Sequence, residues 1–209
     1  MNMISIEKSE ILGLLCAEGY YNSSTVTYLE YDKRRKKTYK RTKKLNIIEF
    51  TNKNKFLLSH FQKLINKEYD YTVNITDTGS CLRIRISKNN IVNDLISYTN
   101  FNSEDWKVPK TIINGSDDIK IAFIRGFYEG DGIKSDRILQ TLRVRICSKN
   151  LKGLKQLEKI LKSLDIESHI YNESNKRIFY TLNMFGKNSL KFLNIIKPQF
   201  KDVKPAEIA

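Results

Sequence analysis

Residues 11–19 read Ile-Leu-Gly-Leu-Leu-Cys-Ala-Glu-Gly, and residues 124–132 read Ile-Arg-Gly-Phe-Tyr-Glu-Gly-Asp-Gly. The two stretches share one chemical pattern, because each has glycine third, a small residue seventh, an acid eighth and glycine ninth. Their mostly apolar residues predict two buried helices that end near the acids.

Further matches follow these stretches in the same order in both halves of the chain. Residues 51–54, Thr-Asn-Lys-Asn, match 147–150, Cys-Ser-Lys-Asn. Farther on, Ser-Lys-Asn at 87–89 matches Gly-Lys-Asn at 186–188. A recurring order of matched segments indicates a duplicated structural unit. We therefore expect a first unit at 1–100, a linker at 101–116 and a second unit at 117–209.

Each unit shows the coarse pattern helix, strand, strand, helix, strand, strand, helix, which predicts an α+β fold. In 82–86 and 142–146, arginine alternates with aliphatic residues, so period two places the aliphatics against the helices and the arginines on an open face. Strands are also predicted at 25–28 and 178–182, and helices at 56–65, 90–97, 151–164 and 189–196.

Capping residues mark the ends of the two glycine-acid helices. Ser5 or Ser9 can cap the first helix and Asp117 the second, because their side chains accept hydrogen bonds from the first turn. Gly19 and Gly132 follow the last turns, where a left-handed glycine often ends a helix.

Small residues four apart lie on one face of each of these helices: Gly13 with Ala17, and Gly126 with Gly130. Such spacing lets two helix backbones approach closely. If the two units pack through these faces, Glu18 and Asp131 meet near a pseudo-two-fold axis.

Two acids at neighbouring helix C-termini are electrostatically unfavourable, because those ends carry partial negative charge and the carboxylates repel each other. A divalent cation such as Mg²⁺, which prefers oxygen ligands, removes the conflict. The alternative is that the small residues serve core packing and the acids are solvated caps. The duplication in register favours the cation site.

The composition limits the class of function. The 209 residues carry a net charge of +14, which indicates an acidic polymer or an anionic surface as partner. Hydrophobic residues make up 40%, enough for a packed core. No apolar run is long enough to cross a bilayer and no signal sequence is visible, so an intracellular protein, in cytoplasm, nucleoid or organelle matrix, is expected. Three scattered cysteines and two histidines argue against a disulfide framework, a zinc site or histidine catalysis.

With these motifs, the chain resembles the single-chain LAGLIDADG homing endonucleases; residues 11–19 look like the first motif and 124–132 like the second. The resemblance implies two pseudo-symmetric αββαββα units, motif helices at the interface, and two curved antiparallel sheets that form a saddle over double-stranded DNA. It also implies a monomer that makes a staggered double-strand break, with Glu18 and Asp131 as ligands of two or three Mg²⁺ or Mn²⁺ ions near the axis. Two alternatives stay open on the same scaffold: a maturase that binds its own intron RNA, and a DNA-binding protein without catalysis.

Phosphodiester hydrolysis also needs positive charge near the scissile phosphate. Lys53 and Lys149 are the candidates, since they stand at matched positions after a strand in each unit. Asn52 and Ser148, just before them, are candidates for positioning water. The alternative for each lysine is a solvated charge, because Lys and Arg together number 37.

A protein that reads a long duplex needs base-edge readers on its sheets. Their assignment here depends on strand register, since a slip of one residue exchanges readers for core residues. The predicted DNA contacts are Thr25, Thr27, Lys37, Tyr39, Arg41, Lys43, Arg83 and Arg85 in the first sheet, and Lys134, Arg137, Gln140, Arg143, Arg145, Lys176 and Arg177 in the second.

Overall fold

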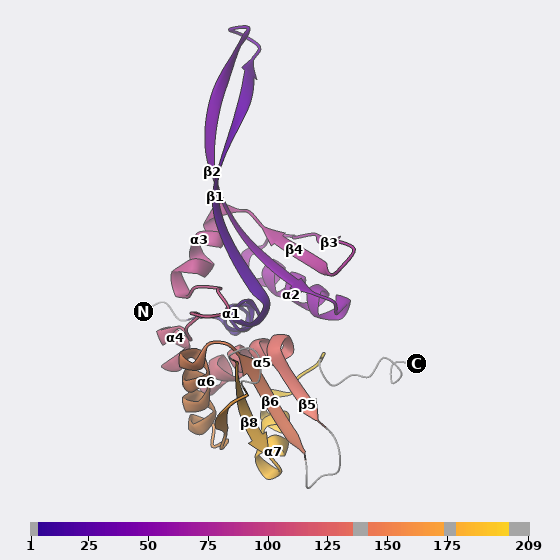
Figure 1. The fold of residues 1–209 in the computed structure, drawn as a ribbon, viewed down its shortest axis with the longest axis vertical. Coiled ribbons are helices and arrows are strands. Elements are labelled where there is room, and N and C mark those ends of the chain that lie inside the picture. Colours follow the sequence, from indigo (N-terminus) through magenta and orange to yellow (C-terminus); the bar gives the residue numbers. More distant parts are fainter. Residues whose placement is uncertain (1–3, 136–141, 174–178, 201–209) are drawn as a thin grey trace.

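The computed structural model describes residues 4–135, 142–173 and 179–200 (Figure 1). The first unit consists of α1 (Ile6–Glu18), β1 (Gly19–Asp32), β2 (Lys37–Asn52), α2 (Lys55–Tyr69), β3 (Ile75–Asp77), β4 (Leu82–Ile86) and α3 (Asn89–Tyr98). After the short α4 (Lys110–Ile113), the second consists of α5 (Asp117–Asp131), β5 (Gly132–Ser135), β6 (Arg143–Ser148), α6 (Leu151–Ser163), β7 (His169–Asn172), β8 (Tyr180–Phe185) and α7 (Lys187–Ile196). The predicted αββαββα order and α+β class are confirmed, while the exact domain boundaries stay a prediction.

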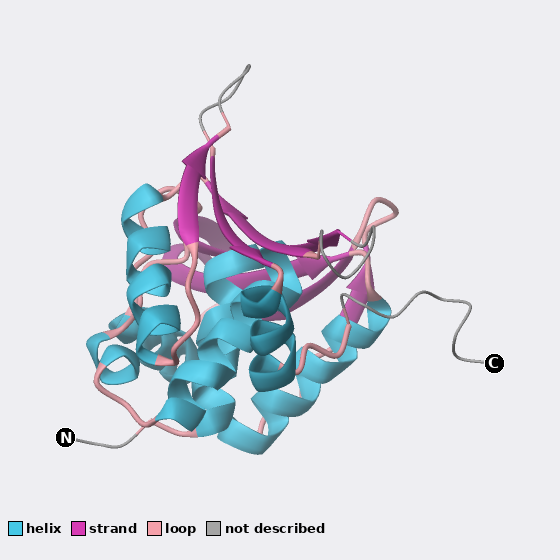
Figure 2. Cartoon of the chain, turned by 90° about the horizontal axis from the view of Figure 1, so that it is seen from below, coloured by secondary structure: helices cyan, strands magenta, loops and turns pink. Residues whose placement is uncertain are grey.

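The two sheets have the same topology. Their strand orders are β1-β2-β4-β3 and β5-β6-β8-β7, and all neighbouring strands are antiparallel. The helices form one layer, and the two curved sheets form a second layer packed against it (Figure 2). Ile84 and Ile86 of β4 and Val144 and Ile146 of β6 are buried between the layers. Period-two alternation therefore leaves the other face of each sheet open.

The β1–β2 hairpin is much longer than β5 and β6, and its far half projects away from the helices (Figure 1). Toward its tip, residues 25–31 of β1 are exposed, among them the large hydrophobic residues Val26, Tyr28, Leu29 and Tyr31, whereas the paired part of β2 is polar and basic. Because neither face is covered, this part is a two-stranded ribbon, and the basic residues 33–37 lie at its turn.

Helix α1 begins as predicted and α5 does not. The Ser5 hydroxyl oxygen accepts from the Lys8 backbone nitrogen at 3.0 Å, whereas Ser9 is buried inside the helix and donates to the Ile119 carbonyl oxygen at 2.6 Å. The cap position of α5 is Ser116, and Asp117 is already the first helical residue. The prediction of Asp117 as cap was one residue too late, although its negative charge still lies in the favourable first turn.

The two glycines that end the motif helices are extended rather than left-handed, so that prediction was wrong. Gly19 has φ −84° and Gly132 has φ −79°. Space requires glycine at these positions: a Cβ on Gly19 would lie 2.8 Å from the Leu15 Cα, and one on Gly132 would overlap the Tyr128 ring. Each helix consequently passes directly into the first strand of its sheet.

Within the described ranges, every helix is too short or too polar to cross a lipid bilayer.

Candidate active site at the contact between two helices

Helices α1 and α5 pack in parallel, with backbone against backbone. A Cβ on Gly13 would overlap the Phe123 carbonyl oxygen and come within 2.9 Å of the Phe127 nitrogen. The reciprocal contact is nearly the same, since a Cβ on Gly126 would overlap the Glu10 carbonyl oxygen and come within 2.9 Å of the Leu14 nitrogen. These paired contacts are what a pseudo-two-fold axis between the helices requires.

Near the C-terminal ends, the axis runs between Ala17 and Gly130. A Cβ on Gly130 would overlap that of Ala17 and lie 3.0 Å from the Glu18 Cγ. Glu18 therefore lies against the residue that directly precedes Asp131. The structure brings the two predicted acids to the same end of the helix pair, at the point where both sheets begin.

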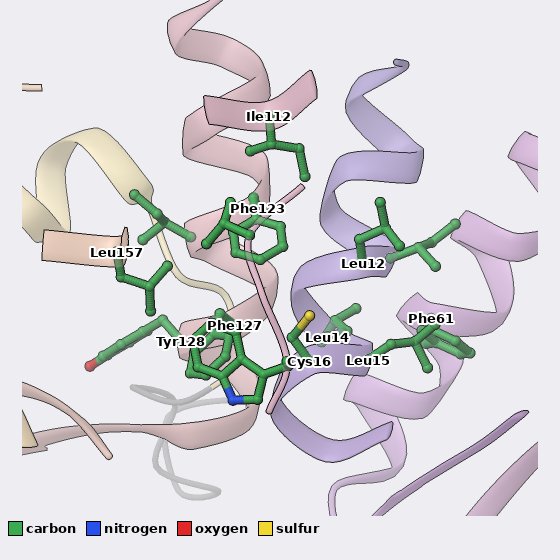
Figure 3. Close-up of a cluster of buried hydrophobic side chains, with 14 of the residues drawn as sticks. Leu12, Leu14, Leu15, Cys16, Phe61, Ile112, Phe123, Phe127, Tyr128 and Leu157 are labelled. Carbon is green, nitrogen blue, oxygen red and sulfur yellow. The ribbon is translucent and has the colours of Figure 1, made fainter. Parts of the chain in front are cut away.

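Apolar side chains surround this contact (Figure 3). Leu12, Leu14 and Leu15 of α1 and Phe123 and Phe127 of α5 are fully buried. Burial also raises the pKa of the Cys16 thiol, so Cys16 is a neutral packing residue and not a nucleophile. Glu18 and Asp131 therefore follow directly after a tightly packed, buried contact between α1 and α5.

In the first unit, Asn52 connects the end of β2 to the acid of α1. Its amide nitrogen donates to Glu18 Oε1 at 3.1 Å, and its Oδ1 accepts from the Asn54 backbone nitrogen at 2.9 Å. Lys53 lies between these two asparagines in the turn, and its side chain is exposed.

In the second unit, Asp131, Ser148 and Lys149 line one cavity of about 280 Å³, together with Cys16 and Ala17 of α1. The Ser148 hydroxyl oxygen accepts from the Asn150 backbone nitrogen at 3.1 Å, so this turn repeats the one at Asn52. The Lys149 Nζ lies 3.8 Å from Glu104 Oε1, in a half-exposed pair.

A divalent cation fits this arrangement chemically. Neither α1 nor α5 has a basic residue in its last turn, so the partial negative charge of both helix ends lies beside the carboxylates of Glu18 and Asp131. Among the residues that the structure describes, no group of three or more His, Cys, Asp or Glu side chains could enclose a metal. Glu18 and Asp131 would supply two carboxylate ligands of the kind that Mg²⁺ prefers.

The strand register corrects part of the predicted DNA face. Glu49 pairs with Arg85 and with Tyr20, which places odd-numbered β2 residues and even-numbered β1 residues on the open face. Thr25 and Thr27 are therefore on the opposite face. The predicted residues on the open face are Lys37, Tyr39, Arg41, Lys43, Arg83 and Arg85.

In the second sheet, the arginines of β6 pair with Ser135 and Ile133, whereas Lys134 pairs with Val144. In register, Lys134 is therefore one position out of the row that contains Arg143 and Arg145, and its role in DNA binding stays a prediction. Four further predicted contacts lie outside the described residues: Arg137, Gln140, Lys176 and Arg177.

Three arginines on the open faces, Arg83, Arg85 and Arg143, are paired with neighbouring acids. Glu49 Oε1 accepts from Arg85 Nε at 2.8 Å and lies 3.6 Å from an Arg83 nitrogen. Arg143 donates through Nε to Asn183 Oδ1 at 2.8 Å and lies 3.6 Å from Glu173. The pairs hold the guanidinium groups in place at the surface.

Sequence reasoning missed a buried charged cluster behind the site. Glu10, with a 7% exposed side chain, contacts His60 Nε2 at 2.7 Å and an Arg125 nitrogen at 3.4 Å. Glu129 is also buried and accepts from the backbone nitrogens of Gln199 and Phe200. Burial raises the pKa of the Glu129 carboxyl, and the two backbone donors oppose that rise. The only signal in the sequence was the presence of polar residues on the apolar faces of both motif helices.

Comparisons with known proteins agree with this geometry. Residues 118–197 match the family model of the LAGLIDADG-like domain. The second unit is thus similar to a LAGLIDADG-like domain. The resemblance noted from the two motifs is thereby confirmed, and the first unit repeats the LAGLIDADG architecture around the shared axis.

Solved structures show that the LAGLIDADG fold extends over the chain. The homing endonuclease I-DmoI in complex with DNA and Ca superposes with a TM-score of 0.66 at 20% identity, over 98% of this chain and 96% of that one. The N-terminal LAGLIDADG domain of DUF199/WhiA gives 0.58 at 17% identity, over 100% of this chain and 90% of that one. Full-length DUF199/WhiA from Thermatoga maritima gives 0.58 at 16%, covering 95% of this chain and 58% of that one. No curated protein matches the sequence.

Proposed function

We propose that this protein is a site-specific DNA homing endonuclease that makes a staggered double-strand break at a long, asymmetric target by metal-dependent phosphodiester hydrolysis. The observation that carries the proposal is the contact of Glu18 with Gly130, the residue before Asp131, at the end of the helix pair where both sheets begin. Structural packing alone does not require acids at both helix ends.

Glu18 and Asp131 would hold Mg²⁺ or Mn²⁺, two or three ions in total, with further oxygens from water and DNA phosphates. When bound, such ions activate water and neutralise charge on the phosphate. Solved complexes of I-DmoI with DNA contain Ca or Mn, and one of its variants was solved with target DNA and Mg, which supports this choice for a chain of the same fold.

The chain's own residues orient the reaction. Asn52 donates to Glu18 and so fixes the direction of that carboxylate. Lys53 and Lys149, which follow the two strand ends, would stabilise the negative charge that grows on each scissile phosphate. Ser148, in the cavity with Asp131, would position a water molecule. Each unit would contribute one set of these residues, so that each DNA strand is cut by the set of one unit.

The open faces of the two sheets would bind the duplex. Their arginines can contact phosphates or guanine edges once DNA displaces the acids that hold them. The long β1–β2 ribbon has the width that a major groove admits, and β5 and β6 are far shorter. Unequal reach on the two sides favours a target without palindromic symmetry.

A second candidate is DNA binding without cleavage on the same scaffold, because the fold shared with the WhiA domain and with I-DmoI does not by itself fix the activity. The same experiment separates the candidates. A supercoiled plasmid that carries the rejoined sequences flanking the coding region is incubated with protein and Mg²⁺, and linear product is measured beside binding.

We expect linearisation by the wild type, and loss of it with retained binding in Glu18→Gln and Asp131→Asn. Matched controls neutralise acids at the opposite ends of the same helices, in Glu7→Gln and Asp118→Asn, and should still cut. Binding without cutting by the wild type would favour the second candidate. Unchanged cutting by both site variants would refute the assignment of the acids.

A further inference from the structure

The matched tetrads 51–54 and 147–150 end in asparagines with a shared structural task. Asn54 Oδ1 accepts from the Phe56 nitrogen at 3.0 Å at the start of α2. Asn150 Oδ1 accepts from the Gly153 nitrogen at 3.0 Å at the start of α6. Each asparagine therefore caps the helix that follows the candidate catalytic lysine.

The other end of each amide reaches across to a segment that comes from the opposite unit. The Asn54 amide nitrogen donates to the Phe200 carbonyl oxygen at 3.4 Å, and the Asn150 amide nitrogen donates to the Trp106 carbonyl oxygen at 2.5 Å. Phe200 follows α7 of the second unit, while Trp106 follows α3 of the first. We name 99–109 and 197–200 the crossing segments.

The second crossing segment is anchored before it reaches Asn54. Arg125 Nε donates to the Ile196 carbonyl oxygen at 2.8 Å, and Glu129 accepts from the Phe200 nitrogen at 3.1 Å. The Phe200 ring then packs on His60 of α2, with centroids 5.1 Å apart. Partly buried contacts thus hold both ends of this short segment.

The first crossing segment is likewise held on the second unit by side-chain contacts and hydrogen bonds. The Trp106 ring lies 4.6 Å from that of Phe127, and it fills the space beside Gly153, where a Cβ would come within 2.5 Å. Its Nε1 also donates to the Ser148 hydroxyl at 3.3 Å. The Val108 nitrogen donates to Gln156 Oε1 at 2.9 Å. The symmetry of these contacts follows the pseudo-two-fold axis.

We propose that Asn54 and Asn150 are positioning residues for Lys53 and Lys149, and that each unit's crossing segment sets the lysine-bearing turn of the other unit. The inference rests on the proposed nuclease function. Each lysine stands between two residues that are hydrogen-bonded to each other. Before Lys53, the Asn52 side chain accepts from the backbone nitrogen of Asn54. Before Lys149, the Ser148 side chain accepts from the backbone nitrogen of Asn150. Loss of the cross-unit bond therefore displaces one lysine and leaves the other in place.

Serine substitutions separate the two tasks of the asparagines. Serine is as good a helix cap as asparagine but has no amide donor, so Asn54→Ser and Asn150→Ser keep the cap and remove the cross-unit bond without adding charge. Asn66→Ser is the matched control, since Asn66 is an exposed residue of the same helix α2 with a local bond to Thr72. The two DNA strands are labelled separately, and the cleavage rate of each is measured in single turnover.

We expect Asn54→Ser to slow cleavage of one strand about tenfold and Asn150→Ser to slow cleavage of the other, because small displacements of catalytic groups are costly. Nicked plasmid should accumulate in both variants and not in Asn66→Ser. Equal slowing of both strands by either variant, or no slowing, would overturn the inference while the nuclease function stands.

A second measurement does not depend on cleavage. Amide hydrogen exchange at Lys197, Gln199 and Phe200 in the free protein should rise in Asn54→Ser and stay at the wild-type level in Asn66→Ser. Unchanged exchange in Asn54→Ser would show that the bond does not hold the segment and would overturn the inference, even if the wild type cuts no DNA.

Discussion

Ala17 and Gly130 face each other across the contact between α1 and α5, so closely that a Cβ on Gly130 would overlap that of Ala17. Only the methyl group of Ala17 lies between the helix backbones there, so Glu18 and Asp131, which follow these two residues, are held by closely spaced backbones. The geometry of the candidate metal site is therefore set by steric contact between small residues, and it depends on both units at once.

Gly126→Ala should destabilise the protein by about 3 kcal/mol, since the added methyl group meets the backbone of Glu10 and Leu14, which cannot rotate away. Urea unfolding measures the change. Gly79→Asn is the control, because Gly79 has φ +82° and open space around it, and asparagine tolerates that conformation. A loss at Gly126 no larger than at Gly79 would contradict the close packing.

Glu10→Ala should lower the free energy of unfolding by about 3 kcal/mol, because it removes a buried carboxylate and leaves the partly buried His60 and Arg125 without their shared partner. A double-mutant cycle with His60→Ala tests the contact directly. Coupling near zero between Glu10 and His60 would show that the pair contributes nothing to stability.

Mg²⁺ should stabilise the free wild-type protein, since it relieves the repulsion between Glu18 and Asp131. At tenfold excess over its dissociation constant, the gain should be about 1.4 kcal/mol, seen as a higher melting temperature. The double variant Glu18→Gln with Asp131→Asn should gain nothing from Mg²⁺. EDTA should abolish cutting and leave DNA binding measurable. An equal rise of the melting temperature with Mg²⁺ in the wild type and in the double variant would refute the metal site.

DNA affinity should fall steeply with salt, and the basic tip of the hairpin should contribute to the slope. Replacing Lys33, Arg34 and Arg35 with alanine should reduce the slope of log K against log salt by about one to three. The control replaces three exposed lysines of α6 in the helix layer: Lys155, Lys159 and Lys162. Equal losses in both triple variants would place the DNA elsewhere than on the sheets.

Glu49→Gln should strengthen binding to random DNA, because it releases Arg85 and Arg83 from their internal partner and removes a negative charge from the open face. The affinity for random DNA should rise a few-fold, so the ratio of target affinity to random affinity should fall. Fluorescence anisotropy on both duplexes measures it. Weaker binding to random DNA would mean that Glu49 supports the arginines rather than competing for them.

The duplication was readable from the sequence because the matched segments occur in the same order, and period two in 82–86 correctly separated Ile84 and Ile86 from the arginines. The side of Thr25 and Thr27 was not readable. That side depends on the exact pairing along a ribbon that buries neither face, so no hydrophobic pattern fixes it.

The site itself was only partly predictable. The spacing of small residues identified the helix contact, because it follows from helical geometry. The partners of Asn54 and Asn150 were beyond reach, since Phe200 and Trp106 are distant in sequence and carry the bond on backbone carbonyls. The histidine–acid cluster was missed for a similar reason: Glu10, His60 and Arg125 come from three separate helices.

The reciprocal crossing segments also bear on why two units share one polypeptide. A covalent join keeps the halves at an effective concentration on the order of millimolar, so their union needs no affinity that would survive dilution. Such an interface tolerates the desolvation of Glu10, His60 and Arg125, which a freely dissociating dimer would have to repeat at every encounter. Fusion into one chain therefore allows the amino-acid sequences of the two units to diverge.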